Sequence, residues 1–156
     1  MVVELPVTTL YMGWGFKSDA QAHSFASCWS QTGLQWPSQG ICCAVLKTRL
    51  DTSAWQALQD WVAGCTPQVQ SQAQWWMGDE VEIAQTTTPS HSERVMQRFA
   101  TGSVSEALAL QAASHYGPSE DISLLLPRIV SEDRRATLAI ATVRQPSSLL
   151  QTGVHS

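Results

Sequence analysis

Charged side chains are scarce in this sequence. They make up 14% of its 156 residues, against about 25% in an average soluble domain. The formal net charge is −4 and the pI is near 5.4. Proteins that bind nucleic acid usually present a basic face, so this composition argues against nucleic acid as a partner.

Lysine is the scarcest of the charged residue types. Lys17 and Lys47 stand against seven arginines. Arginine presents a planar fork of donors that matches the two oxygens of a carboxylate. Composition alone leaves two interpretations open: the arginines are ordinary surface residues, or some of them hold an acidic ligand.

The sequence also lacks metal-binding and catalytic motifs. Its four cysteines form no CxxC pair, and the adjacent Cys42 and Cys43 would point to opposite faces of a strand. We therefore expect buried thiols in a reducing compartment rather than a metal site or a disulfide. No GxSxG, Walker, HExxH or EF-hand pattern is present, so no catalytic residue, metal or cofactor is predicted.

Long hydrophobic runs are missing as well. No apolar run approaches the roughly 20 residues that span a bilayer. The first six residues carry Glu4 and no basic residue, which is unlike a secretory signal. We expect a cytoplasmic protein that does not enter a membrane.

The first half of the chain alternates strand and helix patterns. Residues 7–12 are apolar and run into a Gly-Trp-Gly sequence, which predicts a strand followed by a tight glycine turn. A helix is expected over 18–31, capped by its first or second residue. The apolar run 41–46 predicts a strand buried on both faces, and Asp51 or Thr52 is expected to cap a second helix.

The second half combines helices with a hairpin. Ser90 and Ser103 each open a capping box, so a helix is expected to begin at each. The strand 122–126 is expected to end at the proline that follows it. Residues 128–130 are expected to pair with a final strand at 136–143 across a charged turn.

This order of elements predicts a single α/β domain with a mixed, mainly parallel sheet. A chain of 156 residues is the size of one domain. We expect the domain to occupy residues 1–144 and a flexible polar tail to follow at 145–156.

The predicted sheet also predicts where a ligand would bind. In open α/β sheets, ligands lie beyond the carboxyl ends of the strands. Segments 13–17, 47–51 and 86–90 are expected to meet there. The helix starts at Ser90 and Ser103 would add backbone amides and the positive end of a dipole, which hold carboxylates and phosphates. A plain helix start is the competing interpretation of each.

Several stretches resemble those of a known family. Residues 99–110 (FATGSVSEALAL) are similar to a stretch in which a G-(T/S)-x-S-V turn leads into E-A-x-A-L. Residues 124–128 (LLLPR) and 136–141 (ATLAIA) resemble its L-x-x-P-K and (V/A)-T-x-A-(I/L)-A ending, and residues 13–15 match its opening G-x-G. The sequence thus resembles the CobE family and the C-terminal domain of CbiG, both from cobalamin (vitamin B12) biosynthesis.

Where the family has a basic residue at these positions, this sequence also has one, but lysine and arginine are exchanged. Lys17 follows Phe16 where the family has Cys-Arg, Arg49 and Arg128 stand in place of lysines, and Thr52 stands in place of a glutamate. Arginine does not reproduce the geometry of a lysine. The resemblance therefore implies anion binding at these positions rather than catalysis by lysine.

The resemblance implies a three-layer α/β/α fold and a role in building the corrin ring. In CbiG this domain is fused behind others, in the hydrolase that opens the lactone of cobalt-precorrin-5A, whereas CobE stands alone. The length of the chain leaves no room for the N-terminal domain of CbiG, so we expect the stand-alone form.

The leading hypothesis is a protein that binds a corrin-ring (precorrin) intermediate. Arginine and lysine side chains, Arg94 among them, and the helix starts would hold its acetate and propionate groups, while Trp14 or Phe16 would cover an apolar ring face. The predicted ligand-binding residues are Gly13, Trp14, Gly15, Lys17, Thr48, Arg49, Asp51, Thr88, Ser90, Thr101, Gly102, Ser103, Glu106 and Arg128.

Two alternatives stay open. The first is an enzyme that opens a precorrin lactone, with His91, Glu106 or Asp51 as its acid or base. The second is an assembly partner of another cobalamin-pathway enzyme, with some of the seven tryptophans forming a contact surface.

Overall fold

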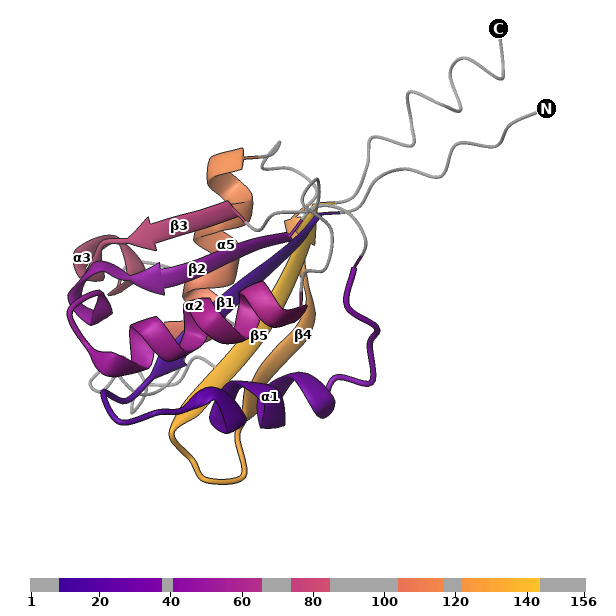
Figure 1. The fold of residues 1–156 in the computed structure, drawn as a ribbon. Helices are drawn as coiled ribbons and strands as arrows, with labels where there is room; N and C mark the ends of the chain where they lie inside the picture. Colours follow the sequence, from indigo (N-terminus) through magenta and orange to yellow (C-terminus); the bar gives the residue numbers. More distant parts are fainter. Residues whose placement is uncertain (1–8, 38–40, 66–73, 85–103, 117–121, 144–156) are drawn as a thin grey trace, which may run out of the picture.

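The structure is a computed structural model, and it describes residues 9–37, 41–65, 74–84, 104–116 and 122–143 (Figure 1). Strands and helices follow one another along the chain. The elements are β1 (Leu10–Phe16), α1 (Ala22–Ser30), β2 (Ile41–Leu46), the 3-10 helix η1 (Lys47–Arg49), α2 (Ser53–Cys65), β3 (Gln74–Gly78), α3 (Glu80–Ala84), α5 (Val104–Tyr116), β4 (Ile122–Val130) and β5 (Ala136–Val143).

The strands form one five-stranded sheet in the order β3-β2-β1-β5-β4. β1 pairs with β2 and β2 with β3 in parallel, whereas β5 is antiparallel to both β1 and β4. Strands β1 to β4 therefore run in one direction and β5 in the other. The predicted α/β fold with a mixed, mainly parallel sheet is confirmed.

Helices cover both faces of this sheet, which gives three layers. α1 and α2 lie on one face and α5 on the other (Figure 1). Alternate residues of β1 point to the two sides: Met12, Trp14 and Phe16 pack with α1 and α2, and Tyr11 packs with α5. We call the side under α1 and α2 the aromatic face and the side under α5 the small-residue face.

Two strands occur where the sequence predicts them. All six residues of β2, Ile41–Leu46, are buried, as expected of a continuous apolar strand with a helix on each side. β5 spans Ala136–Val143 and forms the predicted hairpin with β4. The stretch 75–77, to which the sequence assigns no element, belongs to β3.

The predicted glycine turn at 13–15 is wrong, because β1 continues to Phe16. A Cβ atom at Gly13 would overlap the carbonyl oxygen of Ser105 and lie 2.7 Å from the amide nitrogen of Ala109. Gly13 therefore makes room for the backbone of α5. The buried alanines of α5, such as Ala109 and Ala112, allow the same close packing.

The two helices on the aromatic face begin differently. α1 starts later than predicted: Gln21 is its N-cap, and the Ser24 hydroxyl accepts a hydrogen bond of 3.1 Å from the Gln21 amide. α2 follows the prediction, because Thr52 Oγ1 accepts a hydrogen bond of 3.2 Å from the amide of Trp55. Leu58 and Val62 of this helix are buried against the sheet.

Pro127 does not end β4 as predicted. The strand runs through it from Ile122 to Val130, with register shifts between Leu124 and Leu126 and between Leu126 and Ile129. β4 is an edge strand, and a proline fits there because its missing N–H breaks no ladder bond on the open side. The predicted helix from Ser90 and the predicted tail at 145–156 lie outside the described residues.

The cysteines behave as small core residues. All four are free, and Cys28, Cys42 and Cys43 are buried. Burial raises the pKa of the Cys42 thiol to about 12, so this group stays protonated near neutral pH and is a poor nucleophile. Among the described helices, none is both long and apolar enough to cross a membrane.

Candidate anion-binding site

A hollow of about 130 Å³ lies at the carboxyl end of β1. Its floor and sides come from four parts of the fold that are distant in sequence: the end of β1, η1, the first residue of α5, and the start of β5 with the turn before it. The described residues that line it are Gly15, Phe16, Lys17, Arg49, Val104, Arg134, Arg135, Ala136 and Thr137.

Every ionisable side chain among these lining residues is a cation. Lys17, Arg134 and Arg135 are exposed and Arg49 is half-buried. Four positive charges gather here in a protein whose net charge is −4. A concave surface lined by one sign of charge concentrates ions of the opposite sign, so the electrostatics of the hollow favour an anion.

Helix α5 adds to this positive potential. Its first residue, Val104, lines the hollow, and α5 is 13 residues long. The amino end of a helix carries partial positive charge and amides without partners inside the helix. Gly13 allows α5 to approach β1 this closely, and the sheet thereby places the start of the helix beside the cations.

The turn of residues 131–135, which we call the arginine turn, supplies two of the cations. It closes through a hydrogen bond of 2.9 Å from the Ser131 amide to the Ala136 carbonyl and one of 2.9 Å from the Arg134 amide to the Ser131 carbonyl. Within it, Arg134 has a φ of 62°, a left-handed conformation that is uncommon for residues other than glycine.

Asp133 organises this turn. Its Oδ1 accepts hydrogen bonds from the Ser131 hydroxyl at 2.6 Å and the Arg135 amide at 3.0 Å. Its Oδ2 accepts one from the Ser24 hydroxyl at 2.6 Å and lies 3.3 Å from Nε2 of His23. Desolvation alone would raise the pKa of Asp133, but these hydrogen bonds outweigh it and lower the pKa to about 2.

Arg135 ties the arginine turn to the end of β1. Its carbonyl oxygen accepts a hydrogen bond of 2.9 Å from the Lys17 amide, and its Nε donates one of 3.0 Å to Oδ2 of Asp19. The side chains of Arg135 and Asp19 are both well exposed, so this ion pair adds little stability. Its effect is to restrict the orientation of the guanidinium at the edge of the hollow.

Three of the predicted ligand-binding residues come together in the hollow. They are Gly15, Lys17 and Arg49. Arg134 and Arg135 also line the hollow but are not among the predicted ligand-binding residues, because the sequence identifies them only as part of a charged turn. A signal was available: a hairpin that ends in β5 places its turn at the same edge of the sheet as the carboxyl end of β1.

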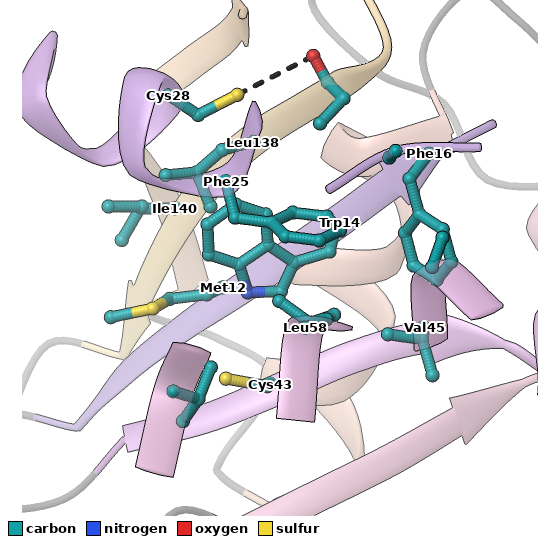
Figure 2. Packing of buried hydrophobic residues seen from close by; sticks show 14 of the residues in the cluster. Met12, Trp14, Phe16, Phe25, Cys28, Cys43, Val45, Leu58, Leu138 and Ile140 are labelled. Atoms are coloured by element: carbon teal, nitrogen blue, oxygen red, sulfur yellow. Dashed lines mark hydrogen bonds between the residues drawn. The ribbon is translucent and has the colours of Figure 1, made fainter. Parts of the chain in front are cut away.

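Two predicted residues belong to the core instead. Gly13 lies under α5. Trp14 is 0% exposed. Its ring packs edge-on against Phe25 on the aromatic face, with centroids 5.6 Å apart (Figure 2), and it packs in the same way against Trp61 at 5.6 Å. The expectation that Trp14 covers a ring of the ligand is wrong, because no part of its side chain reaches the surface.

Glu106 and Arg128 contact each other at another place. The Glu106 side chain is completely buried, and its Oε2 accepts a hydrogen bond of 3.0 Å from the backbone amide of Arg128. This bond joins the first turn of α5 to the irregular part of β4 and satisfies an amide that the register shift leaves out of the ladder. Neither residue lines the hollow.

The remaining predicted residues divide into two groups. Thr48 and Asp51 flank Arg49, are exposed, and do not line the hollow. The others lie outside the described residues: Thr88, Ser90, His91, Arg94, Thr101, Gly102 and Ser103. Within the described part of the chain, His, Cys, Asp and Glu side chains form no group of three that would hold a metal ion.

A comparison with known protein families decides the relationship. The profile described as "Cobalamin synthesis G C-terminus" matches residues 10–141. The chain belongs to this family. The cobalamin synthesis G C-terminal family is part of cobalamin biosynthesis, so the predicted pathway is confirmed. The matched range includes every described residue that lines the hollow.

Solved structures show the same fold as this family member. One is CobE, described as a protein from the cobalamin (vitamin B12) biosynthetic pathway, with a TM-score of 0.64 and 18% identity over 92% of this chain and 100% of the other. A second is the cobalamin biosynthesis protein chiG from Agrobacterium tumefaciens str. C58, with a TM-score of 0.54 and 23% identity over 89% and 100%. Among curated proteins, none matches this sequence significantly.

Proposed function

We propose that this protein binds a corrin-ring intermediate of cobalamin biosynthesis and holds one of its acidic side arms in the hollow. The observation that carries the proposal is the convergence of Lys17, Arg49, Arg134 and Arg135 around the first residue of α5. Such intermediates carry several acetate and propionate groups. Arginine forks and helix amides are the protein groups that bind carboxylates best.

The size of the hollow decides how much of the ligand it encloses. Its volume of about 130 Å³ is well below the roughly 300–1,000 Å³ of pockets that enclose a drug-sized molecule. A macrocycle is larger still. The hollow therefore takes a single carboxylate arm, and the ring lies outside it.

Binding fits the lining better than lactone opening does. Guanidinium and ammonium groups hold a carboxylate, but an arginine does not give up its proton at neutral pH. Glu106, one of the predicted acid or base residues, is buried and bonded to the Arg128 amide. Assembly with other enzymes of the pathway and a cytoplasmic location stay predictions.

Isothermal titration calorimetry with hydrogenobyrinic acid tests the proposal by comparing the Kd of the Arg49→Ala variant with that of the wild type. A hydrogen bond to a charged group contributes about 1.5–3 kcal/mol, and about 1.4 kcal/mol equals a tenfold change in Kd. Arg49 is half-buried, so we expect the substitution to weaken binding about tenfold.

Lys47→Ala is the matched control. Lys47 is also a cation of η1, but it does not line the hollow, so its removal should change the affinity much less. Absence of heat at high micromolar concentrations would contradict the proposal. Equal losses from the two substitutions would contradict the location of the site.

A further inference from the structure

The arginine turn holds Arg134 in a backbone conformation that is unfavourable for a residue with a Cβ atom. The φ of 62° places Cβ too close to the following carbonyl oxygen in any residue but glycine. A glycine at this position would adopt the same backbone without strain. The chain has an arginine there instead, and that arginine lines the hollow. Strained residues of this kind persist where surrounding contacts impose them, and they cluster at binding sites.

The contacts that impose this conformation centre on Asp133. One carboxylate oxygen closes the turn on itself, through the Ser131 hydroxyl at 2.6 Å and the Arg135 amide at 3.0 Å. The other joins the turn to α1, through the Ser24 hydroxyl at 2.6 Å. Nη1 of Arg135 lies 3.9 Å from this second oxygen, so the same carboxylate also faces the guanidinium at the edge of the hollow.

Further hydrogen bonds anchor the turn to its neighbours on either side. The Glu132 amide donates to the Ser27 hydroxyl at 3.0 Å, and the side chain of Gln31 donates to the Val130 carbonyl at 2.9 Å. On the other side, the Lys17 amide donates to the Arg135 carbonyl. The turn is therefore fixed relative to both α1 and β1, and the cations that it carries are preorganised before a ligand arrives.

We propose that Asp133 is a positioning residue of the site: it holds the arginine turn in the strained form that keeps Arg134 and Arg135 at the hollow. This inference rests on the proposed function only in that the hollow binds carboxylates. It requires no corrin ring, and a small tricarboxylate such as citrate is therefore a sufficient probe.

The direction in which Asp133→Ala changes the affinity for citrate distinguishes a positioning role of Asp133 from a purely electrostatic effect of its charge. Asp133 is an acid beside a cationic hollow, so losing its charge should by itself strengthen anion binding. Positioning predicts the opposite for Asp133→Ala, because the turn loses the oxygens that shape it. We expect citrate to bind about fivefold more weakly to this variant, because the arginines are no longer preorganised.

Two further variants complete the set. Asp133→Asn keeps an acceptor oxygen for Ser131 and the Arg135 amide, so it should restore at least the wild-type affinity. Glu132→Ala removes the charge of the neighbouring exposed residue without touching the acceptors of Asp133, and its affinity should be unchanged or slightly higher.

Arg134→Gly tests the strain without removing Asp133. Relief of the left-handed strain should raise Tm by about 3 °C, while loss of the guanidinium should weaken citrate binding about tenfold. Arg134→Ala should lose the same affinity without the gain in Tm. Opposite changes in stability and affinity at one residue would show that the turn is shaped for binding.

Isothermal titration calorimetry at low ionic strength measures the affinity of citrate for the wild type and for the five variants. The inference is overturned if Asp133→Ala binds citrate as well as the wild type does, if Arg134→Gly keeps its affinity, or if the wild type does not bind citrate. Citrate binding that follows the expected pattern, without binding of hydrogenobyrinic acid, would remove the corrin proposal and leave the positioning role of Asp133 in place.

Discussion

The two faces of the sheet solve the same packing problem with different side chains. On the aromatic face, large rings fill the space between sheet and helices, and Trp14, Phe16 and Phe25 meet edge-on at 5.6 Å (Figure 2). On the small-residue face, Gly13 and the alanines of α5 leave almost no space to fill. The second arrangement brings a helix start close to the strand ends, and the candidate site forms there.

The largest expected effect comes from adding one methyl group to the small-residue face. Gly13→Ala would place Cβ against the backbone of α5, which cannot give way as a flexible side chain can. Overpacking of a core costs about 1–3 kcal/mol and occasionally more, and we expect about 3 kcal/mol or more here because the contact is with backbone. Urea unfolding of the variant and the wild type measures this difference.

Met12→Leu is the control for that experiment. Met12 is the preceding residue of the same strand, is completely buried, and points to the aromatic face. A volume-conserving exchange of this kind usually costs less than about 1.5 kcal/mol. If the two substitutions had the same cost, the contrast between the faces would be refuted.

A smaller loss of stability is expected at acidic pH. It comes from Asp133, which joins the arginine turn to α1 on the aromatic face. The pKa of Asp133 is lowered from 3.8 to about 2 in the folded protein. A group whose folded pKa is depressed stabilises the protein fully above its unfolded pKa. The stabilisation by Asp133 is therefore complete above about pH 4 and is lost as the pH falls towards 2.

Urea unfolding at a series of pH values between 5 and 2 tests this expectation against Asp133→Asn. The wild type should lose stability more steeply than the variant over this range, because the amide does not titrate. Parallel curves would show that the contacts of Asp133 do not stabilise its charged form.

Prediction from the sequence succeeded for elements whose local pattern has a single structural explanation. The apolar run 41–46 is bounded by polar residues, and a strand buried on both faces explains it without a competitor. The stretch at 136–143 follows a charged turn and is equally clear. The predicted cap at Thr52 was confirmed because the hydroxyl needs only local geometry to reach the Trp55 amide.

Prediction from the sequence failed at residues whose type can serve more than one structural role. A glycine is needed both for turns and for close packing, and Gly13 serves the second purpose, which depends on a helix more than 90 residues away in the chain. Pro127 stops a central strand but not an edge strand, and strand order is not visible in local sequence. The role of Arg134 depends on a left-handed backbone that hydrogen bonds from α1 help to hold.

The proposed function requires that the hollow at the end of β1 holds an acidic arm of a corrin intermediate. Titration of ¹⁵N-labelled protein with hydrogenobyrinic acid, followed by NMR of the backbone amides, tests it most directly. We expect the largest shifts at the amides of Gly15, Lys17, Val104 and the arginine turn. Shifts centred instead on the outer sides of α1 and α2, with these amides unmoved, would contradict it.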